Sequence, residues 1–490
     1  RDVTGVQTCA LPIYSLSISG LADRAIITTE VLIKPQDNTT MMGLYRSRTM
    51  YCTQCEAEGF RDITYYLDRP DVMSEFTTKV IADKAQYPVL LSNGNPIERG
   101  ELDGGRHFVT WHDPFKKPAY LFALVAGTLS CVDDSFTTLS GRQVALQIFV
   151  EEKDLDKCAH AMLSLKHSMR WDEQAYGREY DLDIFMIVAV DDFNMGAMEN
   201  KGLNIFNTSA VLANPKTTTD AAFQRVEAIV AHEYFHNWSG NRVTCRDWFQ
   251  LSLKEGFTVY RDSQFSADMN SATVKRIEDV SYLRTHQFAE DGGPMSHPVQ
   301  PDSYMEINNF YTLTVYEKGA EIVRMYHSLL GPETYRQATD LYFDRHDGQA
   351  VTIEEFVSAM EDASGRDLTQ FRRWYKQAGT PVVTVRSQYD AEAKTYTLDF
   401  EQSCPATPGQ TDKLPLVIPI KLGLVGADGA DMPLNSAGQT ETVFEMTEAS
   451  QRLVIENINQ EPVPSLLRGF SAPVKLNYNY SAEQLAHLMA

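Results

Sequence analysis

The stretch that decides the fold is His232-Glu233-Tyr234-Phe235-His236, which Leu253-Lys254-Glu255-Gly256 follows further along the chain. Residues four apart lie on one face of a helix, so His232 and His236 can place both imidazoles on a single metal ion. Glu233 projects beside that face and can reach a water at the metal without being a ligand. A catalytic zinc takes three protein ligands and a water, and Glu255 is the candidate for the third. The pattern predicts one zinc ion per chain.

The alternative for this motif is a surface helix that carries two solvated histidines. Its apolar flanks, among them Ile229, Val230 and Trp238, are unusual for an exposed helix face. A buried metal helix is therefore the better interpretation, with Glu233 as a general base.

The composition excludes several classes of protein. The 490 residues are too many for one hydrophobic core and predict several domains. A formal net charge of −22 argues against nucleic acid as a partner, since binding it needs a basic surface. No apolar run is long enough to cross a membrane. Seven cysteines, an odd number in a long chain, are typical of reduced thiols, so we expect a cytoplasmic protein. We also expect the protein to be a monomer.

Two local features need separate explanations. Cys52-Thr53-Gln54-Cys55 invites a zinc or redox interpretation, but no second C-x-x-C pairs with it, so structural or incidental thiols are favoured. Residues 1–13 have no pattern that joins them to the next part of the chain, and we expect them to be a non-native or scar segment.

The pattern of apolar, polar and turn-forming residues along the chain predicts a multidomain α+β protein. Residues 14–127 alternate in short stretches such as 25–29 and 107–111, which predicts a β-domain. Residues 128–379 mix a few strands with long helical patterns and hold the metal motif; residues 380–480 return to short strands, as in a β-sandwich. Residues 481–490 open a further helix. The expected helices are 155–176, 223–238, 252–268, 316–330 and one that begins near Thr352 and runs to Met360.

A second motif, Gly196-Ala197-Met198-Glu199-Asn200, comes after a strand-like stretch at 184–190. Its position is compatible with an edge strand beside the metal helix, where it can pair with an extended peptide. A turn with a capping glutamate is an equally good interpretation of the pentapeptide taken alone.

Together these motifs closely resemble the gluzincin aminopeptidases of the aminopeptidase N family, and most of all its bacterial cytosolic members. The resemblance extends through Cys52-Thr53-Gln54-Cys55-Glu56 and Thr314-Val315-Tyr316-Glu317-Lys318-Gly319-Ala320, and covers residues 14–490. It implies an N-terminal β-domain, a thermolysin-like α/β zinc-protease domain and a small β-sandwich domain. In the family a large helical domain comes next, of which this chain has only the first few residues.

The resemblance also implies roles for individual residues. Tyr316 matches a tyrosine that donates to the oxyanion, although its sequence context alone favours a core tyrosine. Glu199 and Glu56 match the carboxylates that hold the substrate α-ammonium, with Gln54 in support. Met195 matches a wall for the first side chain of the substrate, and ordinary core packing is about as good an explanation. The implied substrate-binding set is Glu199, Glu56, Gln54, Gly196, Ala197, Met198, Asn200 and Met195.

The sequence therefore predicts a zinc-dependent aminopeptidase that acts on peptides with a free N-terminus. A thermolysin-like endopeptidase needs the same zinc site but no amine clamp, so Glu56 and Glu199 count against it. A zinc epoxide hydrolase has no feature here that selects for it. A non-catalytic scaffold is disfavoured because Glu233 and all three candidate ligands are present.

Overall fold

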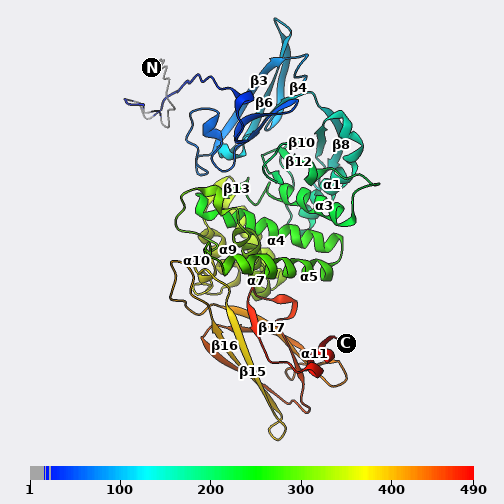
Figure 1. The fold of residues 1–490 in the computed structure, drawn as a ribbon, viewed down its shortest axis with the longest axis vertical. Coiled ribbons are helices and arrows are strands. Elements are labelled where there is room, and N and C mark those ends of the chain that lie inside the picture. Colours follow the sequence, from blue (N-terminus) through cyan, green and yellow to red (C-terminus); the bar gives the residue numbers. More distant parts are fainter. Residues whose placement is uncertain (1–15, 17, 21–23, 490) are drawn as a thin grey trace. The chain divides into compact units, whose positions relative to one another are not determined.

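The structure is a computed structural model, and it describes residues 16, 18–20 and 24–489. The expectation for residues 1–13 lies outside the described residues. The chain divides into two compact units (Figure 1). The first ends at Thr244 and also includes 348–350; the second comprises 245–347 and 351–490.

The first unit begins with two β-sheets, as residues 14–127 predict. One has the order β1-β2-β7-β4 and the other the order β3-β6-β5. The β6 strand pairs antiparallel with both of its neighbours, and turns at Gly94 and Gly104 have the positive φ that favours glycine. The strands are β1 (Gly43–Ser47), β2 (Met50–Gln54), β3 (Ser74–Asp83), β4 (Val89–Ser92), β5 (Asn95–Leu102), β6 (Arg106–Lys117) and β7 (Leu124–Gly127).

A mixed five-stranded sheet comes next in the same unit, in the order β11-β12-β10-β9-β8. Its central strand β10 pairs parallel with β9 and β12 and is almost wholly buried, which explains its continuous apolar sequence. The short β11 pairs antiparallel with β12 and is an edge strand, as predicted. The elements are β8 (Ser130–Thr137), β9 (Gln143–Val150), α1 (Ala159–Ala175), β10 (Ile184–Val190), β11 (Ala197–Met198), β12 (Leu203–Asn207), α2 (Thr208–Val211), α3 (Asp220–Phe235) and β13 (Val243–Cys245).

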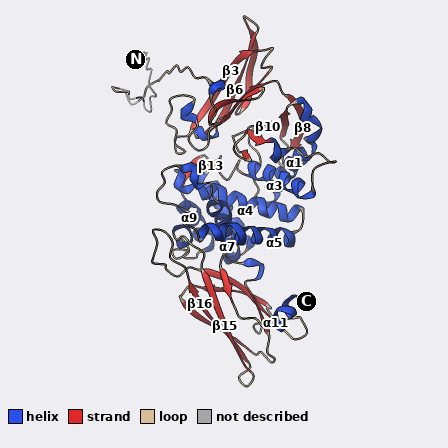
Figure 2. Ribbon diagram, viewed as in Figure 1, coloured by secondary structure: helices blue, strands red, loops and turns tan. Residues whose placement is uncertain are grey.

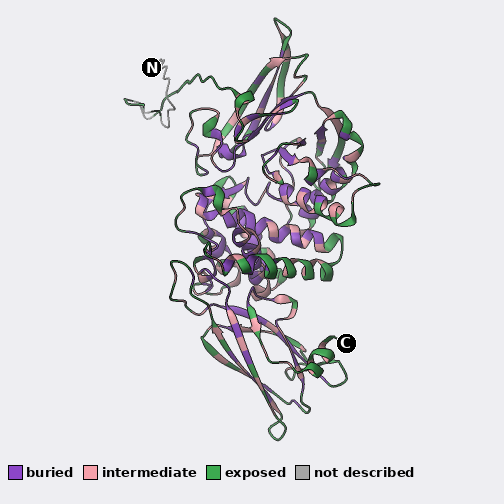
Figure 3. Ribbon diagram, viewed as in Figure 1, coloured by how far each residue is buried: buried purple, intermediate pink, exposed green. Residues whose placement is uncertain are grey.

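The second unit opens with a helical part (Figure 2). Helix α4 is buried along most of its length, whereas α5 has no buried residue (Figure 3). Aromatic side chains fill the core around Phe356, whose ring lies 5.2 Å from that of Phe257 and 5.0 Å from that of Tyr342. The elements are α4 (Leu251–Met269), α5 (Ala272–Tyr282), α6 (Phe288–Asp291), α7 (Gly319–Leu330), α8 (Pro332–His346), β14 (Gln349–Val351), α9 (Ile353–Ser364) and α10 (Arg373–Lys376).

Two π-helices interrupt this part, Leu283–Gln287 (η6) and Thr314–Lys318 (η8). Helix α9 starts where a helix was expected, near Thr352, and it starts with a capping box, in which the Thr352 side chain and Glu355 satisfy backbone groups reciprocally. No described helix combines the length and the apolar character that a membrane span requires.

The second unit ends in two sheets, which confirms the β-sandwich predicted for this part. Their orders are β20-β16-β15-β22 and β18-β17-β19, with β21 paired to β17. Phe400 of one sheet and Phe444 of the other stack with ring centroids 4.7 Å apart. The elements are β15 (Val382–Asp390), β16 (Thr395–Ser403), β17 (Ile418–Val425), β18 (Asp431–Met432), β19 (Glu441–Met446), β20 (Ser450–Glu456), β21 (Val463–Leu466), β22 (Lys475–Asn477) and the helix α11 (Ala482–Met489).

Three details of the sequence prediction were wrong. Residues 25–29 form no strand and are exposed, so their alternation reflects no buried sheet face. The helix expected from residue 155 begins at Ala159, because Glu152–Lys157 forms a 3₁₀-helix first. The helix expected over 316–330 begins as the π-helix η8 and becomes α-helical only at Gly319.

Candidate metal centre and its surroundings

Helix α3 carries the two histidines near its C-terminal end. The Thr219 side chain caps its start by accepting from the Ala222 amide, and Val226, Val230 and Phe235 are buried. His232 lies in the last turn, and His236 is the C-terminal cap. The apolar flanks thus anchor the helix, and the surface-helix alternative is excluded.

The two imidazoles face each other. Their Nε2 atoms are 3.0 Å apart and their rings are nearly perpendicular, at 85°. Nδ1 of His236 lies 2.9 Å from the carbonyl oxygen of Ser239. Because a carbonyl only accepts, Nδ1 carries the proton, and Nε2 of His236 presents its lone pair for a metal. The side chain of His236 is buried, whereas His232 is half-buried.

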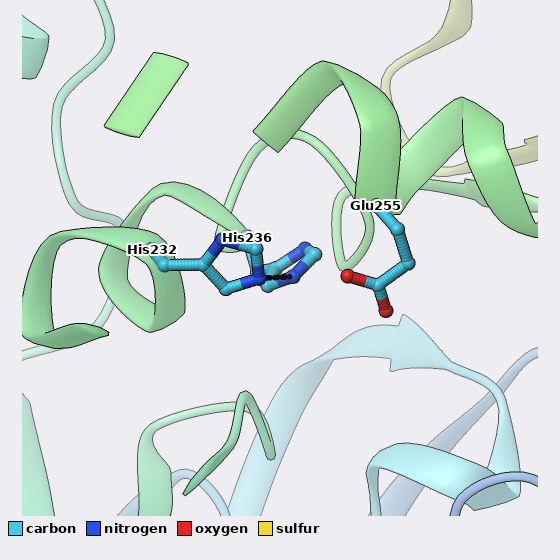
Figure 4. Close-up of side chains that lie close together, drawn as sticks. All are labelled: His232, His236 and Glu255. Carbon is cyan, nitrogen blue, oxygen red and sulfur yellow. Dashed lines mark hydrogen bonds between the residues drawn. The ribbon is translucent and has the colours of Figure 1, made fainter. Parts of the chain in front are cut away.

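Glu255 completes a set of possible metal ligands. One ligand atom from each of His232, His236 and Glu255 lies within 4.8 Å of the other two (Figure 4). Two imidazole nitrogens and one carboxylate are a ligand set that suits zinc. The residues present therefore fit the metal that the sequence predicts.

Two other side chains on these helices bear on the site. Glu233 lies on α3 between the histidines in sequence and is buried to 7% exposure. Lys254 is almost fully buried, and its Nζ lies 2.5 Å from Oε1 of Glu255. A charge-assisted hydrogen bond of this kind fixes the orientation of the Glu255 carboxylate. Sequence reasoning missed Lys254, because an adjacent charge on a helix ordinarily points elsewhere.

The Gly196–Asn200 motif lies where an edge strand was expected. Ala197 and Met198 form β11, and the Gly196 oxygen accepts a hydrogen bond from the Asn207 amide at 2.9 Å. Glu199 and Asn200 come directly after the strand and are buried. The outer edge of β11 pairs with no other described strand of its sheet. An extended peptide could add to such an edge.

Glu199 and Glu56 come together. Carboxylate oxygens of Glu56, Glu199 and Glu255 lie within 4.8 Å of one another, and all three residues are buried. Gln54 donates through Nε2 to the backbone oxygen of Glu56 at 3.2 Å, while its own buried Oε1 has no hydrogen-bond partner among the described residues. Converging carboxylates and an unsatisfied amide oxygen form a site suited to a cation that donates several hydrogen bonds.

The motif and the metal helix are tied together by buried polar contacts. Asn241, in the turn after α3, donates to the backbone oxygen of Glu199 at 2.9 Å. Lys201 donates to Oδ1 of Asn237 at 2.7 Å and also to Asp181. Burial alone would raise the pKa of Asp181, but Lys201 and Arg242 hold that pKa below its ordinary value. These contacts set Glu199 relative to His236, and no local sequence pattern signals them.

Tyr316 lies in the π-helix η8 and is half-buried. This π-helix packs on α4 beside Glu255. Ser252 donates to the Val315 oxygen at 2.8 Å, and a Cβ on Gly256 would lie 2.8 Å from the carbonyl carbon of Gly319. Only glycine allows an approach this close. Neither the core-tyrosine interpretation nor the oxyanion role is tested by this burial, and the oxyanion role stays a prediction.

Met195 precedes β11 in a loop and is half-buried. It therefore is not a fully buried core residue.

Cys52 and Cys55 are buried free thiols, and burial raises the pKa of Cys52 to about 12. A thiol held protonated in this way binds metal poorly, which supports the structural interpretation of these cysteines.

Comparisons with known proteins cover nearly the whole chain. Residues 24–121 match the peptidase M1 N-terminal domain, 160–375 the peptidase family M1 domain, and 379–479 a domain of unknown function with an Ig-like fold (DUF3458). Aminopeptidase N of Escherichia coli (strain K12) is 58% identical over 97% of this chain and 55% of the relative. Aminopeptidase N of Caulobacter vibrioides is 58% identical over 94% of this chain and 53% of the relative.

A solved structure of an aminopeptidase is also similar to this chain. Legionella pneumophila aminopeptidase A, in complex with aspartic acid, matches with a TM-score of 0.84 and 37% identity, over 92% of this chain and 50% of that one. The chain therefore spans about half the length of the relatives it matches.

Proposed function

Because the chain belongs to the peptidase M1 family, we propose that it removes N-terminal amino acids from peptides by zinc-dependent hydrolysis. The observation that carries the proposal is the pair of imidazole Nε2 atoms 3.0 Å apart, in a set of possible metal ligands that also includes Glu255. The buried carboxylates of Glu56 and Glu199 support an amino-terminal specificity.

The proposal extends to organisation and setting. The catalytic domain would comprise residues 128–379, between an N-terminal β-domain at 14–127 and a β-sandwich at 380–480. The substrates would be peptides with a free N-terminus, acted on by a monomer. The six cysteines of the described part are free thiols, which supports a reducing, cytoplasmic setting.

In the proposed reaction, His232, His236 and Glu255 hold the metal. Zinc, when bound, supplies Lewis-acid polarisation of the scissile carbonyl and of the attacking water. The protein fixes the ligand geometry: the Ser239 carbonyl orients His236, and Lys254 orients Glu255.

Glu233 moves the protons. Its carboxylate takes a proton from the water as the new C–O bond forms, and then delivers one to the leaving amine as the C–N bond breaks. Glu233 is buried to 7% exposure and lies on α3 between the two histidines in sequence, which supports this role.

Tyr316 would donate a hydrogen bond from its hydroxyl to the oxyanion that forms when the water attacks. Such a donor lowers the barrier only if it is in place before the reaction begins. The packing of η8 on α4 would hold the segment that carries Tyr316 rigidly enough for this role.

Glu199, Glu56 and Gln54 would hold the substrate α-ammonium. An ammonium offers three donors, and two carboxylates with one amide oxygen supply three acceptors. The edge of β11 would pair with the substrate backbone beyond the ammonium, so that the first peptide bond lies at the metal.

The metal assignment gives the first prediction. The protein should bind one zinc ion per chain, which a chelator removes and added zinc restores. Glu255→Gln should weaken zinc binding, since it removes an anionic ligand. Metal analysis after equilibrium dialysis measures the effect.

A matched control is Glu278→Gln, the same neutralisation on the exposed helix α5. That variant should keep the parent's zinc affinity. An unchanged affinity in Glu255→Gln would remove Glu255 from the ligand set.

The oxyanion role gives the second prediction. Tyr316→Phe should lower kcat by about 10²- to 10³-fold, because one donor to an oxyanion is lost. KM should change little, since this bond forms mainly in the transition state. Steady-state kinetics with an aminoacyl amide substrate measures both constants.

Tyr311→Phe is the control. The ring of Tyr311 lies 6.3 Å from that of Tyr316, and this substitution also removes a phenolic hydroxyl. A Tyr316→Phe effect confined to KM would make Tyr316 a substrate-binding residue instead.

A further inference from the structure

The π-helix η8 that carries Tyr316 is held at both of its ends. At the start, the Thr314 amide donates to Oε1 of Glu290 at 2.8 Å, and Gln287 donates to the Thr314 hydroxyl at 3.2 Å. In the middle, the Val315 oxygen accepts from Ser252. A π-helix is a rare conformation that often marks a functional site, and surrounding contacts must stabilise it.

The last residue of η8, Lys318, enters a buried polar knot. Its Nζ lies 2.8 Å from Oδ2 of Asp291 and donates to the carbonyl oxygen of Gly379 at 2.8 Å. Thr380 donates its hydroxyl to the same Asp291 oxygen at 2.9 Å. The side chains of Lys318 and Asp291 are each 1% exposed. We call Lys318, Asp291, Gly379 and Thr380 the lysine knot.

The lysine knot is a costly way to stabilise a fold. Removing two charges from water costs several kcal/mol per ion, and well-packed apolar residues of similar volume often stabilise a protein as well or better. Burial alone would raise the pKa of Asp291, but Lys318, Gln287 and the Thr380 hydroxyl hold that pKa below its ordinary value. A buried pair of this kind is best explained by the unique geometry that it imposes.

That geometry acts on Tyr316, which lies two residues before Lys318 within the same π-helix. The next residue, Gly319, packs against Gly256 on α4 with no room for a Cβ, so the chain directly after η8 lies close against α4. The long Lys318 side chain is held at its far end by Asp291 and the Gly379 carbonyl, which ties the last residue of η8 to these two segments.

We propose that the lysine knot positions the Tyr316 hydroxyl. Lys318 and Asp291 are positioning residues in this proposal, and Gly379–Thr380, the segment that leads into β15, makes the β-sandwich part of the same support. The inference rests on the oxyanion role proposed for Tyr316.

A double-mutant cycle tests the proposal. Four proteins are compared with an aminoacyl amide at saturating zinc: the parent, Lys318→Met, Tyr316→Phe and the double variant. Lys318→Met should lower kcat by about 10- to 100-fold with little change in KM, since a misplacement of about 1 Å can cost about 100-fold. On the Tyr316→Phe background the same substitution should change kcat by less than about twofold, because the hydroxyl it positions is gone.

A matched control is another buried lysine pair, Lys117 and Asp113, whose charged atoms are 3.0 Å apart with side chains 2% and 0% exposed. Lys117→Met should lower the unfolding temperature, but its effect on kcat should be the same on both backgrounds. Thr380→Val is the milder variant if Lys318→Met fails to fold. It removes one hydroxyl from the lysine knot and should give the same coupled pattern with a smaller loss, of about 2- to 10-fold.

The outcomes separate the inference from the function on which it rests. Equal losses from Lys318→Met, or from Thr380→Val, on both backgrounds would overturn the positioning role while leaving Tyr316 as the oxyanion donor. Full kcat in Tyr316→Phe alone would overturn the oxyanion role and the positioning proposal together.

Discussion

Glu233→Gln should keep zinc and the fold but lower kcat by about 10²- to 10⁴-fold, the range over which a positioned acid–base group contributes. The amide has nearly the size of the carboxylate, so the buried site on α3 remains filled. It cannot accept a proton from the water or deliver one to the leaving amine. The loss should therefore fall on kcat, with KM nearly unchanged.

The measurement is steady-state kinetics alongside zinc analysis and thermal unfolding of the same sample. Glu227→Gln is the control and should retain activity. It neutralises a half-buried glutamate on the same helix α3. Near-normal kcat in Glu233→Gln with zinc bound would show that another group moves the protons.

The second large effect concerns the free N-terminus. Glu199→Ala should lower kcat/KM on free-amine substrates by an amount equivalent to about 2–5 kcal/mol of transition-state stabilisation. This is the usual effect of removing one partner of a buried, hydrogen-bonded charge pair. For the parent, blocking the same peptide with an N-acetyl group should have a comparable effect, because the acetyl group removes the ammonium. Rates on paired free and acetylated peptides measure both.

Glu58→Ala is the control, since Glu58 lies near Glu56 in sequence but pairs with Arg61 at 3.5 Å on a half-exposed surface. It should leave the ratio of the two rates unchanged. Equal rates of the parent on both peptides would mean that no amine clamp exists, and an endopeptidase would then be the better interpretation.

Those parts of the site that depend on local geometry could be predicted from sequence. His232 and His236 are close because helical spacing brings them together, whatever the rest of the fold does. The start of α9 was predictable for the same reason, because a capping box acts within one turn. The edge position of β11 could be expected from the strand before it and from the shortness of the motif.

Contacts between distant segments were not predictable from spacing. Glu56 and Glu199 converge only because two sheets of one unit place them there, and the resemblance to a family, rather than any periodicity, pointed to them. Lys318 finds Asp291 and Gly379 through tertiary packing that no local pattern records. The π-helix η8 was predicted as an ordinary helix, since an extra residue in one turn barely alters an amphipathic pattern.

The contact between Nδ1 of His236 and the Ser239 carbonyl has a consequence for how sequence change is tolerated here. A main-chain acceptor is present whichever side chain residue 239 carries, so the ligand's tautomer withstands substitution at that position. Its neighbour Gly240 has φ of 142°, a conformation that favours glycine and shapes the loop that presents the carbonyl. The ligand's tautomer therefore does not depend on the side chain of one of two adjacent residues but does depend on a backbone conformation that favours glycine at the other, although neither side chain would touch the metal.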